Sequence, residues 1–260
     1  MYIEDIATID GYRHVYLSPH LDDAALSCGG RIVTQIAAGE PVLVVTLCTA
    51  APPPEGPFSA LAQQFHADWG LAPAQAVAAR LVEERLAMER LGCDYYWANM
   101  LDAIYRYPAA YNSRESLFNT PAPDDPLFAQ LRQFLADLLE RLPQAQIYAP
   151  LGVGSHVDHL ITHAAAHSLL GDELRFYEDL PYAIRPGALE QRQATIDDAL
   201  VPSTLAIDAA LPAKIEAIAA YASQLDELFG GSEAMAQAIA AYAHAATPTG
   251  GAYGERLWVR

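Results

Sequence analysis

Cysteine is scarce in this chain, and its three occurrences cannot build a covalent framework. Cys28, Cys48 and Cys93 are odd in number and widely spaced, and they contain no CxxC pair. Such a set provides no disulfide scaffold of the kind that small secreted domains need. Cys28 and Cys48 lie in apolar stretches, which favours a role as small core residues.

Positive charge is also scarce. The chain has 15 Lys and Arg residues against 32 Asp and Glu, which gives a formal net charge of −17. No segment rich in Lys and Arg interrupts this balance, so phosphate backbones and anionic membrane surfaces are repelled. We therefore expect no nucleic-acid partner.

Long apolar runs are missing as well. No uninterrupted stretch approaches the ~20 apolar residues that a membrane span requires, and Met1–Arg13 lacks the basic and apolar regions of a signal peptide. We therefore expect no membrane insertion and a cytoplasmic location. A hydrophobic content of 52% with 18% charged residues predicts a globular chain rather than a disordered one.

Short β-prone stretches alternate with helical patterns along the chain. A strand at His14–Leu17, a helix at about 24–38 and a strand at Pro41–Leu47 form a βαβ unit. Further strands are predicted at Asp94–Ala98, Ile147–Pro150, Leu174–Tyr177 and Glu255–Val259. Further helices are predicted at 59–69, 74–91, 131–142, 159–170, 214–228 and 232–246. The alternation predicts an α/β fold with a mostly parallel sheet and helices on both faces.

The chain shows no internal repeat and no linker composition, so we expect one domain over residues 1–260. Its core would span about 12–182, and a mostly helical C-terminal part would span about 203–260. Residues 99–125 contain no clear element. A loop of that length is usually a lid or a binding loop.

Two segments rich in His and Asp each follow a predicted strand, the first at residues 18–24 and the second at 154–159. The carboxyl ends of parallel strands meet at one edge of a sheet. The two segments therefore bring together His20, Asp22, Asp23, His156, Asp158 and His159. Imidazole and carboxylate ligands with one open position suit a catalytic zinc site, and a further carboxylate beside it suits a general base.

Simpler interpretations compete with the metal site. Asp22 or Asp23 would serve as the N-cap of the following helix, and the histidines of the second segment would form a polar stripe on an exposed helix. The occurrence of both segments directly after strands favours the metal site.

Both segments resemble the signatures of a known family. Pro19-His20-Leu21-Asp22-Asp23, with Gly29-Gly30 behind it, and His156-Val157-Asp158-His159 resemble the motifs of the PIG-L/LmbE-like N-acetylglucosaminyl deacetylases. Arg80-x-x-Glu83 before Leu91-Gly92 resembles the connecting helix of that family. The resemblance covers roughly residues 12–182.

The resemblance implies a Rossmann-like fold, a bound Zn²⁺ and removal of an N-acyl group, expected to be N-acetyl, from a sugar-bearing small molecule. By position, zinc would be held by His20, Asp23 and His159. Asp22 would be the general base, and His156 would be the cation that stabilises the oxyanion or protonates the leaving amine. Asp158 would hold His156 in orientation. Relatives of this type often form trimers or hexamers, so a homo-oligomer is expected.

The sequence departs from the family pattern at two positions. Leu21 stands where proline is usual, and Ala24 stands where glutamate is usual. That glutamate is a supporting residue, so its loss leaves the ligand set intact and indicates a branch with a different substrate.

Several other polar residues are weaker candidates for the site. Arg80 and Asp102 would contact sugar hydroxyls, although an intrahelical pair with Glu83 or Glu84 is an alternative for Arg80. Other candidates are His163 as a substitute ligand or packed residue, Glu178-Asp179 as support, and Tyr105, Tyr107 and Tyr111 as stacking residues.

Other functions remain open at this point. A phosphoesterase would need two metals and cationic clamps, for which the chain supplies few residues. A metal-dependent hydrolase of another amide or ester, and a non-catalytic carbohydrate-binding protein of the same fold, are further alternatives. A nucleotide-binding domain is disfavoured because no GxGxxG follows the first strand.

Overall fold

The structure is a computed structural model that describes residues 1–69, 72–196, 199–248 and 250–260. Its strands form one eight-stranded sheet in the order β1-β4-β3-β2-β5-β6-β8-β7. Their bounds are β1 (Tyr2–Ile3), β2 (His14–Ser18), β3 (Val42–Thr46), β4 (Asp94–Trp97), β5 (Gln146–Pro150), β6 (Arg175–Tyr177), β7 (Val201–Ala206) and β8 (Gly254–Val259). Strands β1 to β6 are parallel, and β8 runs antiparallel to both β6 and β7. The prediction of a mostly parallel α/β sheet is confirmed.

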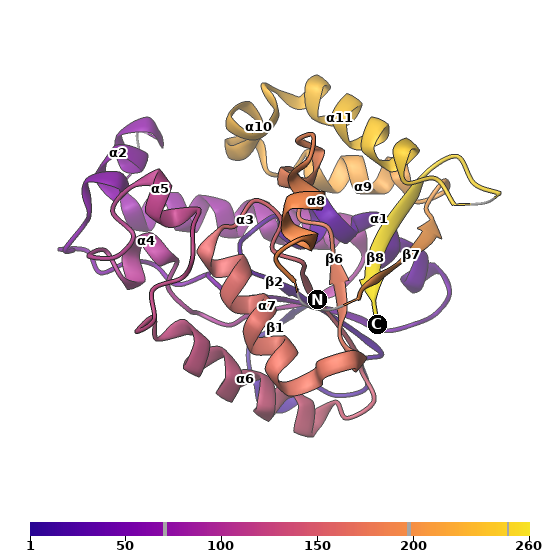
Figure 1. Cartoon of the computed structure of the whole chain (residues 1–260), viewed down its shortest axis with the longest axis horizontal. Coiled ribbons are helices and arrows are strands. Elements are labelled where there is room, and N and C mark those ends of the chain that lie inside the picture. The colour runs from indigo at the N-terminus through magenta and orange to yellow at the C-terminus, as the bar shows by residue number, and fades with distance from the viewer. Residues whose placement is uncertain (70–71, 197–198, 249) are drawn as a thin grey trace.

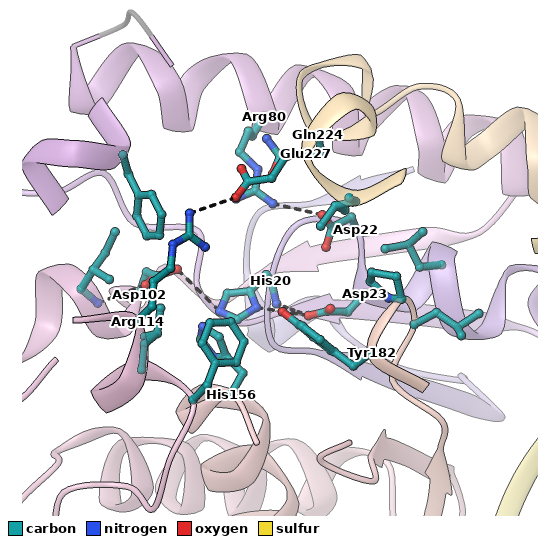
Figure 2. A pocket seen from close by; sticks show the side chains of 18 residues that line it. His20, Asp22, Asp23, Arg80, Asp102, Arg114, His156, Tyr182, Gln224 and Glu227 are labelled. Atoms are coloured by element: carbon teal, nitrogen blue, oxygen red, sulfur yellow. Dashed lines mark hydrogen bonds and ion pairs between the residues drawn. The ribbon is translucent and has the colours of Figure 1, made fainter. Parts of the chain in front are cut away.

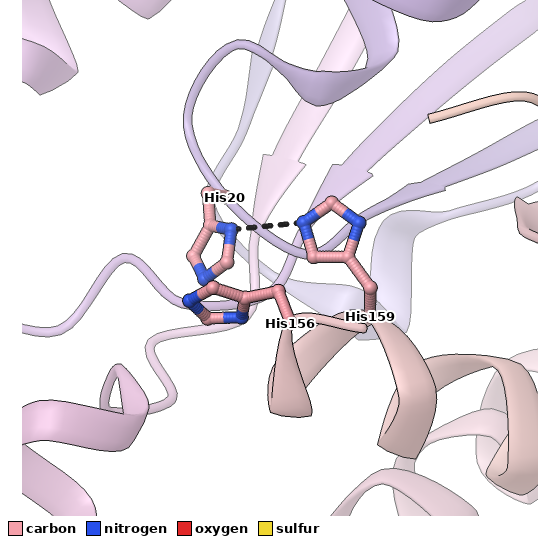
Figure 3. Close-up of side chains that lie close together, drawn as sticks. All are labelled: His20, His156 and His159. Carbon is pink, nitrogen blue, oxygen red and sulfur yellow. Dashed lines mark hydrogen bonds between the residues drawn. The ribbon is translucent and has the colours of Figure 1, made fainter. Parts of the chain in front are cut away.

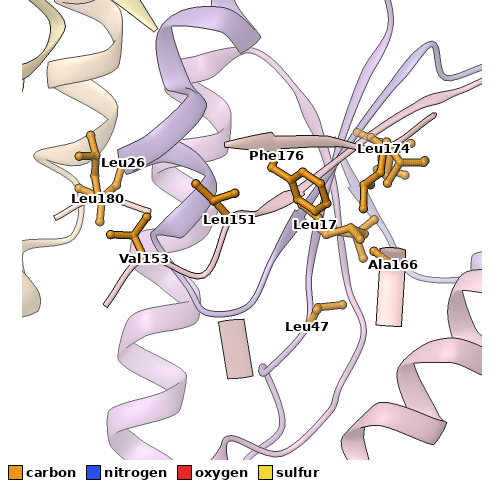
Figure 4. Packing of buried hydrophobic residues seen from close by; sticks show 14 of the residues in the cluster. Leu17, Leu26, Leu47, Leu151, Val153, Ala166, Leu174, Phe176 and Leu180 are labelled. Atoms are coloured by element: carbon orange, nitrogen blue, oxygen red, sulfur yellow. The ribbon is translucent and has the colours of Figure 1, made fainter. Parts of the chain in front are cut away.

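The apolar strands place alternate side chains on opposite faces of the sheet. Val15 and Leu17 of β2 belong to one buried cluster, and Tyr16 between them belongs to another. The first cluster contains residues of α6 (Leu127–Arg141) and α7 (Val157–Leu170), and the second contains residues of α1 (Asp23–Ala37), α3 (Pro73–Leu91) and α9 (Leu211–Ile218). Helices therefore cover both faces, as Figure 1 shows. Figure 4 shows Leu17 and Phe176 packed near Ala166 of α7.

The C-terminal part differs from the prediction in two ways. The single helix predicted at 214–228 is wrong, because α9 ends at Ile218 and α10 (Ala222–Phe229) begins after a turn. At this turn Tyr221 is fully buried and donates to Glu84 of α3, so tertiary packing overrides the helical pattern. This part also contains strand β7, which was not predicted. Strand β8 and helix α11 (Ser232–Ala245) confirm the predicted strand at Glu255–Val259 and the predicted helix at 232–246.

Two strands and the three short helices α4 (Ala103–Arg106), α5 (Arg114–Leu117) and α8 (Ala188–Gln193) were not predicted. Strand β1 has only two residues, and β7 is a largely exposed edge strand that contains Pro202, so neither carries an apolar pattern. The segment 99–125 contains α4 and α5. The remaining elements are α2 (Ala60–Trp69) and the 3-10 helices η1 (Ile6–Thr8), η2 (Gly171–Glu173) and η3 (Tyr182–Ile184).

The paired glycines behind the first motif have a packing role. The Glu255 carboxylate of β8 accepts from the backbone N–H groups of Gly30 (2.8 Å) and Arg31 (2.7 Å) in α1. A Cβ at Gly30 would lie 2.8 Å from Ile207 Cδ1 and 2.9 Å from Glu255 Oε1. Glycine therefore permits β8 and the segment before α9 to pack directly on α1.

Among the described residues, no helix has both the length and the apolar character that crossing a membrane requires.

Candidate active site

The carboxyl ends of the parallel strands carry the candidate residues to one edge of the sheet. His20, Asp22 and Asp23 follow β2, and His156, Asp158 and His159 follow β5. Asp102 follows β4, and Asp179 follows β6. The two motif segments therefore meet, because β2 and β5 are neighbours in the sheet.

Three atoms converge at the base of this edge. His20 Nδ1 lies 3.3 Å from His159 Nε2, and Asp23 Oδ2 lies 3.4 Å and 3.3 Å from these two nitrogens. Tetrahedral ligands with metal bonds of about 2.0–2.1 Å are separated by about 3.3–3.4 Å. The three side chains therefore fit zinc without rearrangement and leave a fourth position open.

The outer nitrogens of both histidines are held by carboxylates. His159 Nδ1 lies 2.7 Å from Asp179 Oδ1, and His20 Nε2 lies 3.1 Å from Asp158 Oδ2. Asp179 is itself fixed by the backbone N–H groups of Gly152 and Val153. Such partners set the tautomer and ring orientation of metal-binding histidines. The supporting role predicted for Asp179 agrees with this contact.

The backbone at Asp22 turns the two adjacent carboxylates apart. Asp22 has φ of 133°, a conformation that non-glycine residues rarely adopt. Its side chain makes no cap hydrogen bond, and Ser18 Oγ instead accepts from the backbone N–H of Ala24. The N-cap interpretation of Asp22 is therefore wrong. Asp23 Oδ2 accepts from the backbone N–H of His20 (2.8 Å).

Asp22 has the environment of a base. Burial raises the pKa of its carboxyl, while the adjacent Arg80 guanidinium, whose Nη2 lies 3.2 Å from Asp22 Oδ2, opposes the rise. A raised carboxyl pKa brings the group closer to the range in which it can take and return a proton near neutral pH.

The predicted contact between the Asp158 carboxylate and His156 is wrong. Asp158 meets His156 through its backbone N–H, which donates to His156 Nδ1 (3.2 Å). Its carboxylate instead contacts His20 Nε2 and Arg106 Nη2 (2.6 Å). The reason is that Asp158 lies in the first turn of α7, where its side chain faces β2 and α4 rather than the cap residue.

The predicted positive charge on His156 also disagrees with the structure. Because His156 Nδ1 accepts a backbone hydrogen bond, its proton is on Nε2 and the ring is neutral. Burial lowers the pKa of His156 well below its usual value, and the nearby His20 lowers it further. His156 can therefore donate from Nε2 as a neutral imidazole.

Other groupings of ligand-type side chains occur in the same place. The rings of His20, His156 and His159 converge, as Figure 3 shows, and His20, Cys48 and Asp158 form a second group. In the second group, burial raises the pKa of the Cys48 thiol well above its usual value, which disfavours the thiolate that a metal needs. Asp158 is also already paired with Arg106.

Arg80 and Asp102 both line the site. Arg80 Nη2 donates to the Leu21 carbonyl (2.7 Å) and to Asp22, so the alternative pairing with Glu83 or Glu84 is not formed. Asp102 Oδ1 caps α4 through the Ile104 N–H, and its Oδ2 lies 3.6 Å from His20 Nε2.

The remaining candidates have structural contacts. His163 stacks on Phe176 with ring centroids 4.3 Å apart, and burial lowers its pKa to about 3, which agrees with a packed residue. Tyr111 is 1% exposed and donates to Asp125, so the idea that it stacks on a ligand is wrong. Tyr105 is also buried.

Motif reasoning missed much of the pocket wall. Figure 2 shows a pocket with the His and Asp residues at its base and further side chains around it. These further residues share no motif and come from 99–125, from the turn after β6 and from α10: Arg114, Phe118, Tyr182, Gln224 and Glu227. Single polar residues on irregular segments give no sequence signal that would have identified them.

Glu84 follows Arg80 by about one turn of α3 and is fully buried, which predicts a pH-dependent stability. Burial raises the pKa of its carboxyl from 4.5 to about 7, against the hydrogen bonds from Tyr221 and Thr46. The stability that this raised pKa contributes is fully present below pH 4.5 and is lost as the pH rises through 7. A shift of that size corresponds to about 3 kcal/mol.

We therefore expect Glu84→Gln to gain stability relative to the wild type as the pH rises from 5 to 8. Urea unfolding at both pH values measures the difference, and the exposed Glu89→Gln on the same helix is the control. A difference that does not change with pH would contradict the assignment.

Known proteins share the sequence pattern and the fold of this chain. The model of the PIG-L family, GlcNAc-PI de-N-acetylase, matches residues 15–170. This chain belongs to the PIG-L family. The 2'-N-acetylparomamine deacetylase of Streptomyces fradiae is 30% identical to this PIG-L family member over 264 residues, which cover 95% of the chain and 89% of the relative.

Solved structures of deacetylases share the fold of this PIG-L family member. The zinc-inhibited form of teicoplanin deacetylase Orf2 has a TM-score of 0.79 at 28% identity, covering 95% of this chain and 97% of its own. The A40926 pseudoaglycone deacetylase Dbv21 has a TM-score of 0.76 at 30% identity, covering 96% and 97%. The chain is thus related to N-deacetylases in both sequence and fold.

Proposed function

We propose that this chain is a zinc-dependent N-deacetylase that removes an acetyl group from an amino sugar within a small glycoconjugate. The observation that carries the proposal is the convergence of His20 Nδ1, Asp23 Oδ2 and His159 Nε2 at 3.3–3.4 Å beside the buried Asp22. Membership of the PIG-L family and the deacetylase activities of the relatives support the reaction class.

The three converging side chains would hold the metal. When bound, zinc supplies polarisation of the acetamide carbonyl and lowers the pKa of a water molecule. The carboxylates of Asp179 and Asp158 keep the two histidine rings oriented toward the centre. This chain therefore provides a preformed ligand set rather than one assembled on binding.

Asp22 and His156 would perform the proton and charge steps. The Asp22 carboxylate takes the proton from the attacking water and returns it to the leaving nitrogen, so no net proton is consumed at the residue. His156 lines the same pocket and donates from Nε2 to the carbonyl oxygen as this oxygen gains negative charge. A neutral donor suffices for this role.

Arg80 and Asp102 would position the sugar. Arg80 lies beside Asp22, and Asp102 lies beside His20. Both side chains line the pocket, so their polar groups border the space that a sugar would occupy.

Release of acetate tests the proposal directly. The full chain, loaded with zinc, is incubated with a panel of N-acetylated amino sugars and with acetate esters of the same sugars. We expect acetate and free amine from at least one N-acetyl compound and no release after chelation. Release from the esters alone would instead indicate an esterase, and release from neither would contradict a hydrolase.

A further inference from the structure

Two charged residues at the entrance of the pocket belong to neither motif. Arg114 begins α5 and Glu227 lies on α10, so the pair joins two segments that are distant in the sequence. Resting on the proposed N-deacetylase function, we propose that Glu227 selects substrates that carry an ammonium group on the part beyond the acetylated sugar. Arg114 occupies the place of that ammonium group in the free protein.

The exposure of these residues places them at the mouth. The side chains of Arg114 and Glu227 are 56% and 51% exposed, whereas Asp23 and His159 at the base are buried. Arg114 Nη2 lies 3.4 Å from Glu227 Oε1, and Figure 2 shows this contact on the side of the pocket away from Asp23. A substrate whose acetamide reaches the base would therefore extend past this pair.

The pair is weak enough for a ligand to displace it. An exposed ion pair of this length contributes about 0–1 kcal/mol, so an incoming ammonium group can replace Arg114 at Glu227 at little cost. The displaced guanidinium keeps a second contact, because Arg114 lies 4.9 Å above the ring centroid of Phe65. The exchange therefore leaves neither residue without a partner.

Charge favours a cation over an anion at the mouth of the pocket. With zinc bound at the base, its two positive charges and those of Arg80 and Arg114 offset the four acids Asp22, Asp23, Asp102 and Glu227, so the preference comes from the ion pair at the mouth and from the acidic surface. Each arginine is already paired with one of these acids. An anionic substrate would have to break such a pair and would leave the acid without its cation. The net charge of −17 also attracts cations from solution.

Substitution at each member of the pair should have opposite effects. The substrates are 2'-N-acetylparomamine, which is cationic, and N,N'-diacetylchitobiose, a neutral two-ring probe. For the cationic substrate we expect Glu227→Gln to lower kcat/KM by about fivefold, mainly through KM, and Arg114→Gln to raise it by about two- to fivefold because the competitor is gone. The ratio of kcat/KM for the cationic substrate to kcat/KM for the neutral probe should therefore fall in Glu227→Gln and rise in Arg114→Gln.

The controls separate this inference from the function on which it rests. Glu140→Gln removes one exposed acid on α6, so it matches the change in net charge without touching the pocket. Added salt should weaken turnover of the cationic substrate more in the wild type than in Glu227→Gln. If both probes release acetate and Glu227→Gln has no effect, the inference is wrong and the deacetylase function stands. If only the neutral probe releases acetate, the inference is also wrong. If neither probe releases acetate, the inference and the deacetylase function are both wrong.

Discussion

Alanine at Asp23 or His159 will leave the protein folded but without a stoichiometric metal. Each substitution removes one of three converging ligand atoms, and the two that remain cannot define a tetrahedral site. Changes to residues that only support a ligand already cost about 10–100-fold in metal affinity, so loss of a ligand should cost at least about 100-fold. Activity should fall with the metal.

Competition with a chromogenic chelator measures the affinity, and circular dichroism checks the fold. His244→Ala, an exposed histidine on α11, is the matched control and should bind zinc as the wild type does. The zinc titration should begin below one equivalent per chain and continue above it, so that inhibition by excess zinc is detected. Teicoplanin deacetylase Orf2 has a zinc-inhibited form. Full zinc binding by both ligand variants would disprove the assignment.

His156→Ala separates two ligand sets within the same experiment. Its ring lies with His20 and His159, so a site of three histidines is an alternative to the site with Asp23. If His156 only donates to the substrate, the variant keeps its zinc and loses turnover. Loss of zinc in this variant, with zinc retained in Asp23→Ala, would establish the three-histidine site.

Asp22→Asn will keep the metal and lose about 10²–10⁴-fold in turnover, the range for loss of a general base. The amide has nearly the shape of the carboxylate and still accepts the hydrogen bond from Arg80, but it cannot take the proton of the attacking water. Substrate affinity should change much less than kcat. Zinc content and steady-state kinetics of the same preparation measure both quantities.

Asp23→Asn provides a comparison for Asp22→Asn. The two residues are adjacent, but the backbone at Asp22 directs their side chains apart. Asp22→Asn should therefore lose turnover and keep zinc, whereas Asp23→Asn should lose zinc. Loss of zinc from Asp22→Asn and not from Asp23→Asn would show that the two roles are exchanged.

The strands of the central sheet were predictable because they are short, apolar and buried on both faces. β2, β3 and β5 have such sequences, and the motifs directly after them indicate where the chain turns into the site. The neighbouring positions of β2 and β5 then bring His20 and His159 together. Local pattern and sheet topology are sufficient for this part of the site.

Contacts between distant segments were not predictable in the same way. The Asp158 carboxylate contacts His20 and Arg106 because α4 packs against the first turn of α7, which no local pattern of residues 99–125 indicates. The break between α9 and α10 depends on burial of Tyr221 against Glu84. When two side chains in contact come from distant segments, the local sequence around either residue does not indicate the contact.

The hydrogen bonds between β8 and α1 set a minimum length for an active chain. The segment matched by the PIG-L family model ends at residue 170. The Glu255 carboxylate of β8 nevertheless accepts hydrogen bonds from α1, the helix that begins at Asp23, and is paired with the buried Lys214. A shortened version that carries every motif but stops before β8 would leave the Gly30 and Arg31 amides without this acceptor. Truncations near the C-terminus would therefore destabilise α1 and lower activity, although they remove no residue that lines the pocket.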